Sequence, residues 1–199
     1  MAEKPASGSK AVPLFASFTG GEKETATSKP SETHRFLTDI YQKYVDAVYR
    51  YHYARLGDVS EAQDLTSETF HATLVNIRQF DPGRGTPGAW IMGIARRKLA
   101  DHFRRNRSSA HLELPEDLPD RSVPPEVQVT RRLDMRRIAQ ALKSISPARA
   151  EALALHFFGG LSIEETAQAM NKRQPAVKKL VQRGLGDMRR VLWTMEESE

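Results

Sequence analysis

Apolar side chains recur every three or four positions through most of the chain after residue 31, which is the period of an amphipathic α-helix. The first such stripe predicts a helix over residues 34–56, which ends at Gly57 and Asp58. A second stripe, with Ser60 as its N-cap, predicts a helix that ends near Arg78. Nothing in the sequence alternates with the period of a strand, so it predicts an all-α fold.

A loop rich in glycine and proline, residues 81–88, precedes a third apolar stripe that extends from Trp90 to Phe103. No helix can cross this loop, because proline lacks a backbone N–H and glycine favours non-helical conformations. Beyond residue 125 the same periodicity predicts four more helices, over residues 126–143, 147–158, 162–170 and 174–194.

Composition divides the chain into helical blocks and connecting segments. Residues 1–30 are rich in small and polar side chains and lack sustained periodicity, so we expect a disordered tail. Residues 111–130 hold five acidic side chains, one basic side chain and several prolines, which is typical of a flexible linker. The sequence therefore predicts two small helical domains, over residues 31–110 and 131–195.

The second block has the pattern of a helix-turn-helix. Ser162 and Glu165 form a capping box that begins the first helix, and Pro175 suits the first turn of the second. The apolar face of that second helix is predicted to be buried; it comprises Val177, Leu180, Val181, Leu185 and Met188. Its opposite face is basic and polar and suits either a DNA major groove or plain solvent; it comprises Pro175, Lys179, Gln182 and Arg183, with Lys178 at its flank.

The third helix also has a basic face, which suits the phosphates of a nucleic acid or an ordinary solvated surface. Arg97 and Arg104 lie one heptad apart, and Asp101 is placed to pair with Arg97 and with Arg105, each four residues away. The chain as a whole has a formal net charge of +5, which by itself is only a weak indication of a polyanionic partner.

Two aromatic residues, Phe80 and Trp90, lie on either side of the glycine- and proline-rich loop. Aromatic rings beside a basic surface can stack on an unpaired base. They are also common anchors of a hydrophobic core, and the sequence leaves both interpretations open.

Three carboxylates, Glu61, Asp64 and Glu68, share one face of the second helix. They suit a protein-docking face or solvent better than a cation site or acid–base chemistry, because no histidine or further acidic ligand accompanies them. The six histidines are never three or four residues apart, and there is no cysteine. The sequence therefore predicts no metal site, no cofactor and no catalytic residue. We accordingly expect that the chain is not an enzyme.

Taken together, these motifs resemble the bacterial RNA polymerase sigma factors of the extracytoplasmic-function (ECF) group, which contain only conserved regions 2 and 4. The resemblance covers residues 33–194. Its motifs are Glu61-Ala-Gln-Asp-Leu-Thr-Ser-Glu-Thr-Phe70, Phe80-Asp-Pro82, Gly88-Ala-Trp-Ile-Met-Gly-Ile-Ala-Arg-Arg97, Asp101-His-Phe-Arg-Arg105, Leu161-Ser-Ile-Glu-Glu-Thr-Ala167, Ala176-Val-Lys178 and Gln182-Arg-Gly-Leu185.

The resemblance implies a subunit that binds RNA polymerase core and directs promoter recognition, DNA melting and initiation for an alternative regulon. The polymerase clamp would contact Glu61, Asp64, Leu65 and Glu68. The minus-ten element, with one base flipped into the loop 81–89, would contact Phe80, Arg84, Trp90, Arg96, Arg97, Arg104 and Arg105. The minus-thirty-five element would contact Arg173, Gln174, Pro175, Lys178, Lys179, Gln182 and Arg183.

The resemblance also implies an inhibitory anti-sigma partner and a place in the bacterial cytoplasm, on the nucleoid. Arg173 stands where the family usually has a capping serine, which we expect to cost the recognition helix about 1 kcal/mol.

Two other functions remain open. One is a helix-turn-helix regulator that acts without polymerase; the other is a metal-dependent nuclease or hydrolase that uses Glu61, Asp64 and Glu68.

Overall fold

The computed structural model describes residues 32–106 and 125–197, and every regular element within these ranges is helical. The predicted tail (residues 1–30) and most of the predicted linker (residues 111–130) lie outside the described residues. The elements are α1 (Glu32–Leu56), α2 (Val59–Val75), the 3₁₀ turns η1 (Ile77–Gln79) and η2 (Pro82–Arg84), α3 (Pro87–Asn106), α4 (Pro125–Ser144), α5 (Pro147–Leu153), the π turn η3 (Ala154–Phe158), α6 (Ile163–Met170) and α7 (Gln174–Glu196). The all-α prediction is confirmed.

Helices α1, α2 and α3 pack against one another through apolar faces, as their stripes predicted. The start of α2 differs from the prediction: its N-cap is Asp58, whose Oδ1 accepts a hydrogen bond of 2.8 Å from the Glu61 N–H, and not Ser60. Gly57, with φ of 76°, makes the reversal before it, a conformation that glycine adopts without a Cβ penalty. The N-cap is therefore the aspartate that follows this glycine, two residues before the predicted serine.

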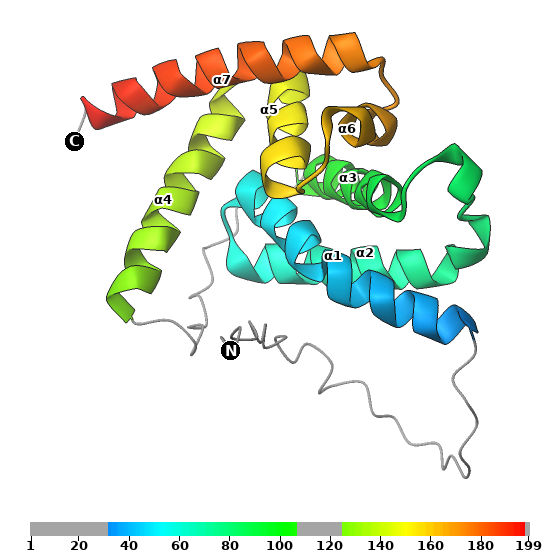
Figure 1. Cartoon of the computed structure of the whole chain (residues 1–199). Helices are drawn as coiled ribbons and strands as arrows, with labels where there is room; N and C mark the ends of the chain where they lie inside the picture. The colour runs from blue at the N-terminus through cyan, green and yellow to red at the C-terminus, as the bar shows by residue number, and fades with distance from the viewer. Residues whose placement is uncertain (1–31, 107–124, 198–199) are drawn as a thin grey trace, which may run out of the picture.

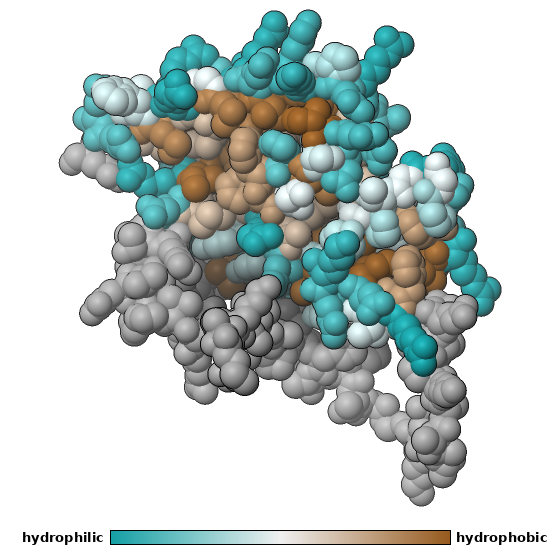
Figure 2. All heavy atoms as spheres, in the orientation of Figure 1, coloured by the Kyte–Doolittle hydropathy of each residue, from teal (hydrophilic) through white to brown (hydrophobic). Residues whose placement is uncertain are grey.

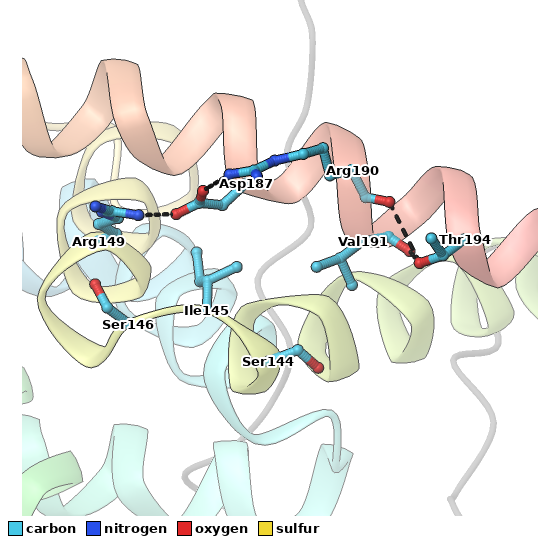
Figure 3. Close-up of a pocket in the computed structure, with 8 residues that line it drawn as sticks. All are labelled: Ser144, Ile145, Ser146, Arg149, Asp187, Arg190, Val191 and Thr194. Carbon is cyan, nitrogen blue, oxygen red and sulfur yellow. Dashed lines mark hydrogen bonds and ion pairs between the residues drawn. The ribbon is translucent and has the colours of Figure 1, made fainter.

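The second block is built on α7, which lies across α4, α5 and α6 (Figure 1). Asp187 of α7 accepts a hydrogen bond from Arg149 of α5 and another from Arg190 of α7 itself (Figure 3). Gly184 lets the two helices approach closely, since a Cβ there would lie 2.9 Å from Leu153 Cδ1. Leu185 is 45% exposed, so its predicted place on the buried face is wrong: α7 meets α5 through Gly184 instead.

The predicted helix over residues 147–158 is regular only as far as Leu153 and then widens into η3. Here the Gly159 N–H donates to the carbonyl of Ala154, five residues earlier, at 2.9 Å, which is the hydrogen-bond pattern of a π turn. The π-helix is rare, and it occurs mostly as a single wide turn of this kind within an α-helix.

The two blocks share one buried cluster in place of two separate cores. Helix α1 contacts α4 and η3, and α3 contacts α6. Figure 2 shows apolar side chains between α7 and the helices below it, with hydrophilic side chains along the outer side of α7. Within the described ranges, no helix is both long and apolar enough to cross a lipid bilayer.

Candidate nucleic-acid interface

The loop between α2 and α3 is held in one shape by hydrogen bonds from its own residues. Asp81 Oδ1 accepts from the Gly83 N–H at 2.9 Å and so caps η2. Thr86 Oγ1 accepts from the Ala89 N–H at 3.2 Å, at the start of α3. A loop fixed in this way can present a preformed pocket to a ligand.

Phe80 and Trp90 face each other across this loop, with ring centroids 5.3 Å apart and planes tilted by 46°. Phe80 also stacks on Phe36 of α1, at 5.8 Å. Both Phe80 and Trp90 are half-buried, and both line a pocket of about 450 Å³. They therefore anchor the loop and also leave ring surface exposed to the pocket, so the two interpretations from sequence are compatible.

Three arginines line the same pocket: Arg84 from η2 and Arg96 and Arg97 from α3. An aromatic wall beside several guanidinium groups suits a base with its phosphate. Arg104 and Arg105 are exposed in the last turn of the same helix, α3. All seven residues predicted to contact the minus-ten element thus belong to this loop and α3.

The charge pairing of α3 differs from the prediction. Asp101 pairs with Arg104, at 2.9 Å, in place of Arg97. Spacings of three and four residues are both close on a helix, so local rotamers decide between them. Arg97 stays exposed and lines both the pocket beside Trp90 and a second one beside Asn76.

The acidic face of α2 is divided between ion pairs and solvent. Glu61 lies 3.5 Å from His102, and Glu68 lies 3.2 Å from Lys98, both on α3. Asp64 is exposed, whereas Leu65 is 2% exposed and packs in the core. Leu65 is therefore not part of the exposed face on which it was predicted to contact polymerase, because its position on α2 faces α1 and α3.

The described residues contain no group of three or more side chains suited to hold a metal ion. The most unusual titratable group is instead a core residue, His52, which is fully buried. Its Nε2 lies 3.1 Å from Thr69 Oγ1, and within the described structure its Nδ1 has no hydrogen-bond partner. Burial, with a smaller contribution from His102, lowers the pKa of His52 to about 3, so the ring is neutral at pH 7.

The helix-turn-helix of α6 and α7 begins with the predicted capping box. Ser162 Oγ accepts from the Glu165 N–H at 3.1 Å, and Glu165 Oε2 accepts from the Ser162 N–H at 2.9 Å. The turn passes through Asn171 in the left-handed conformation, with φ of 52°. Arg173 is the N-cap of α7 and makes no side-chain cap hydrogen bond, which confirms the missing cap.

The start of α7 presents a polar face to solvent. Val177 and Val181 are buried against the rest of the block, as predicted. The seven residues predicted to contact the minus-thirty-five element are all exposed: Arg173, Gln174, Pro175, Lys178, Lys179, Gln182 and Arg183. The geometry is that of a helix able to enter a major groove.

Comparisons with known proteins agree with this geometry. The family model for Sigma-70 region 2 matches residues 40–109, and the model for Sigma-70, region 4 matches residues 135–188. The ECF RNA polymerase sigma factor BldN of Streptomyces coelicolor is 37% identical over 155 residues, which cover 77% of this chain and 59% of that protein. SigX of Bacillus subtilis, also an ECF RNA polymerase sigma factor, is 26% identical over 172 residues, which cover 83% of this chain and 87% of SigX.

Among solved structures, CnrH in complex with the cytosolic domain of CnrY has the same fold, with a TM-score of 0.62 at 20% identity, over 80% of this chain and 89% of CnrH. The chain belongs to the sigma-70 family. Within that family it is a member of the extracytoplasmic-function group, as its sequence motifs indicated.

Proposed function

We propose that the chain is the sigma subunit of a bacterial RNA polymerase: it binds the core enzyme, directs it to promoters and helps to melt them. The observation that supports this most is the presence of two different candidate DNA surfaces in one chain. One is a fixed pocket with Phe80, Trp90 and three arginines, and the other is the exposed start of α7. A regulator that acts without polymerase needs only the second of these.

The two surfaces suit two forms of DNA. An unpaired base can enter a pocket and stack on an aromatic ring, which suits the minus-ten element once its strands separate. Base edges of a duplex are accessible to a helix in the major groove, which suits the minus-thirty-five element. Lys178 and Gln182 are the side chains on α7 whose chemistry and exposure best suit direct contact with bases and phosphates.

For the polymerase, we propose the acidic face of α2 as the docking surface, with Glu61, Asp64 and Glu68 as contacts and Leu65 as the core residue beneath them. The chain would catalyse nothing alone and would act in the cytoplasm, on the nucleoid. An anti-sigma partner is part of the proposal, because a solved structure of the same fold contains the sigma factor RpoE in complex with the anti-sigma factor NepR from Bartonella quintana.

Binding to core polymerase tests this function directly. The purified chain, mixed with core enzyme, should co-elute with it on size exclusion, and the variant with Asp64→Arg should lose most of that binding. Asp46→Arg, an exposed aspartate on α1, is the matched control and should bind as the natural chain does. A chain that binds duplex DNA but not core would contradict the proposal and favour the polymerase-independent regulator.

A further inference from the structure

The helix-turn-helix lies directly against the loop that we propose to receive the minus-ten base. Thr86 of the loop donates a hydrogen bond of 2.8 Å to Glu165 Oε1 of α6. A Cβ on Gly85 would lie 2.8 Å from Gln168 Oε1. Gln168, Ala169 and Asn171 form one wall of the pocket that contains Trp90. We call this arrangement, with α6 against the loop and α3, the closed state (Figure 1).

In the closed state a single carboxylate, Glu151 of α5, binds the second block to α1 and α3 of the first block. Its Oε1 accepts a hydrogen bond of 2.7 Å from the hydroxyl of Tyr51 and lies 3.5 Å from Arg96 Nε. Its Oε2 lies 3.8 Å from Arg55 Nε. The Glu151 side chain is 13% exposed, and Tyr51 is fully buried. Burial first, and the neighbouring Glu151 second, raise the pKa of Tyr51, so its hydroxyl remains a donor.

Separation of the two blocks would remove these partners and expose the carboxylate to water, so Glu151 favours the closed state by the net strength of its contacts. Two guanidinium groups and a phenol compensate its charge only while the two blocks stay in contact. Hydrogen bonds in which one partner is charged contribute more to stability than those between neutral groups. Arg96 is also one of the residues that line the pocket beside Trp90, so in the closed state it is engaged by Glu151.

The closed state is too compact to contact both promoter elements. Their positions, minus ten and minus thirty-five, differ by about 25 base pairs, or about 85 Å of duplex at 3.4 Å per base pair. The longest described helix, α1, has 25 residues and is therefore only about 38 Å long. Asn171, three residues before α7, lines the same pocket as Trp90. The two blocks must therefore separate before both surfaces contact one promoter.

We infer that the closed state is autoinhibitory and that Glu151 is its latch: while Glu151 is bound to Tyr51, Arg55 and Arg96, α6 closes one side of the single-strand pocket of the free chain. This inference rests on the proposed function for the meaning of the pocket. The latch itself is a property of the free chain and is measurable without DNA or polymerase.

The latch can be tested by intramolecular energy transfer. The chain has no cysteine, so Gln42→Cys on α1 and Arg189→Cys on α7, both exposed, give two specific labelling sites. We expect high transfer in the free chain and a low-transfer population about tenfold larger with Glu151→Ala, the change that loss of one charged hydrogen bond would produce. Glu164→Gln, an exposed glutamate on α6, is the control and should keep high transfer.

Unfolding would also lower transfer, so the helical circular dichroism signal is recorded for each variant. Tyr51→Phe removes only the hydroxyl and leaves the ring in the core, so it should shift transfer in the same direction by a smaller factor. If Glu151→Ala and Tyr51→Phe, both folded, kept the transfer of the parent chain, the latch would be refuted. Should Glu151→Ala fail to fold, Tyr51→Phe and Glu151→Gln decide by the same criterion.

A second measurement separates failure of the latch from failure of the proposed function. The probe is a fluorescent pool of random single-stranded 15-mers, titrated with the free chain and followed by anisotropy. We expect several-fold tighter binding by Glu151→Ala than by the parent chain, and no change with Glu164→Gln. Opening without any DNA binding would overturn the proposed role of the pocket and leave the latch standing, whereas DNA binding without opening would overturn the latch.

Discussion

The two candidate DNA surfaces differ in how accessible the free chain leaves them. The start of α7 is exposed, and its predicted contact residues face solvent. The loop before α3 is held against α6, and Arg96 beside it is paired with Glu151. Under our proposal, the duplex-binding helix is therefore displayed at all times, whereas one side of the single-strand pocket is closed by α6 until the blocks separate.

The two ends of the shared buried cluster also differ in polarity. The core around α1, α2 and α3 contains His52, Thr66, Thr69 and Thr73, whereas Thr166 is the single buried polar residue recorded for the described part of the second block. His52 is the residue most sensitive to acid, because protonation would put a charge where its Nδ1 finds no partner. The first block should therefore respond to pH more strongly than the second.

The largest predicted effect follows from His52. Its pKa is about 3 in the folded chain and 6.5 when unfolded, so the unfolded chain binds more protons as the pH falls below 6.5. His52 therefore leaves the free energy of unfolding unchanged above about pH 6.5 and lowers it as the pH falls further, by about 3 kcal/mol at pH 4.5. Urea unfolding followed by Trp90 fluorescence, in a chain with Trp193→Phe, measures this loss.

Replacing the histidine sharpens the same test. His52→Asn should remove most of the loss between pH 7 and pH 4.5, whatever its effect on stability at pH 7. His71→Asn, an exposed histidine on α2, should leave the loss unchanged. An equal loss in His52→Asn and in the parent chain would contradict the assignment.

The next effect concerns the single-strand pocket. Trp90→Ala should impair promoter opening by about 2 kcal/mol, the contribution of stacking one base on an aromatic ring, and should affect closed-complex binding much less. Opening is measured by the fluorescence of 2-aminopurine in the minus-ten element. Trp193→Ala, a tryptophan that is 63% exposed on α7, is the matched control. Normal opening by folded Trp90→Ala would show that the ring serves the core alone.

Variants at the start of α7 should show the opposite pattern, because they should affect binding to duplex DNA more than promoter opening. Gln182→Ala should weaken binding to the minus-thirty-five element by about 1.5 kcal/mol and should relax base preference there, because an amide that contacts a base edge discriminates among bases. Gel-shift titration of promoter variants measures both. Gln140→Ala, an exposed glutamine on α4, is the control. An equal loss on all sequences would reassign Gln182 to phosphate contact.

The smallest predicted effect is a gain. Arg173→Ser should add a side-chain acceptor for the Ala176 N–H, which now donates to the Arg173 carbonyl at 3.0 Å, and should stabilise the chain by about 1 kcal/mol in urea unfolding. Lys172→Ser, one residue earlier and also exposed, should not. If the two variants were equally stable, Arg173 would not be limiting the start of the helix.

The sequence predicted those features that depend on neighbouring residues. Helix periodicity, the capping box of Ser162 and Glu165 and the missing cap at Arg173 are all local, and the structure confirms each. Leu185 was misplaced because the contact between α5 and α7 depends on Gly184, whose lack of a side chain gives no apolar signal. Periodicity identifies a face of a helix but not the exact line along which another helix meets it.

Contacts between the blocks could not be predicted from residues that are neighbours in the sequence. Tyr51 and Glu151 are 100 residues apart, and Thr86 and Glu165 are 79 apart. Glu151 stands in a run of alanines and leucines with no motif around it, so its role is visible only when α5 meets α1 and α3. The chemistry of the two candidate DNA surfaces could be predicted from sequence, but their difference in accessibility could not.

The most direct test of the central claim is transcription by core polymerase and this chain from a library of random promoters. The claim predicts that transcribed templates become enriched in two sequence blocks, near minus ten and minus thirty-five, with a fixed spacing between them. Changing Gln182 should alter the upstream block, and changing Trp90 should reduce transcription from all templates. Enrichment of a single block, or no transcription above that of core alone, would contradict the claim.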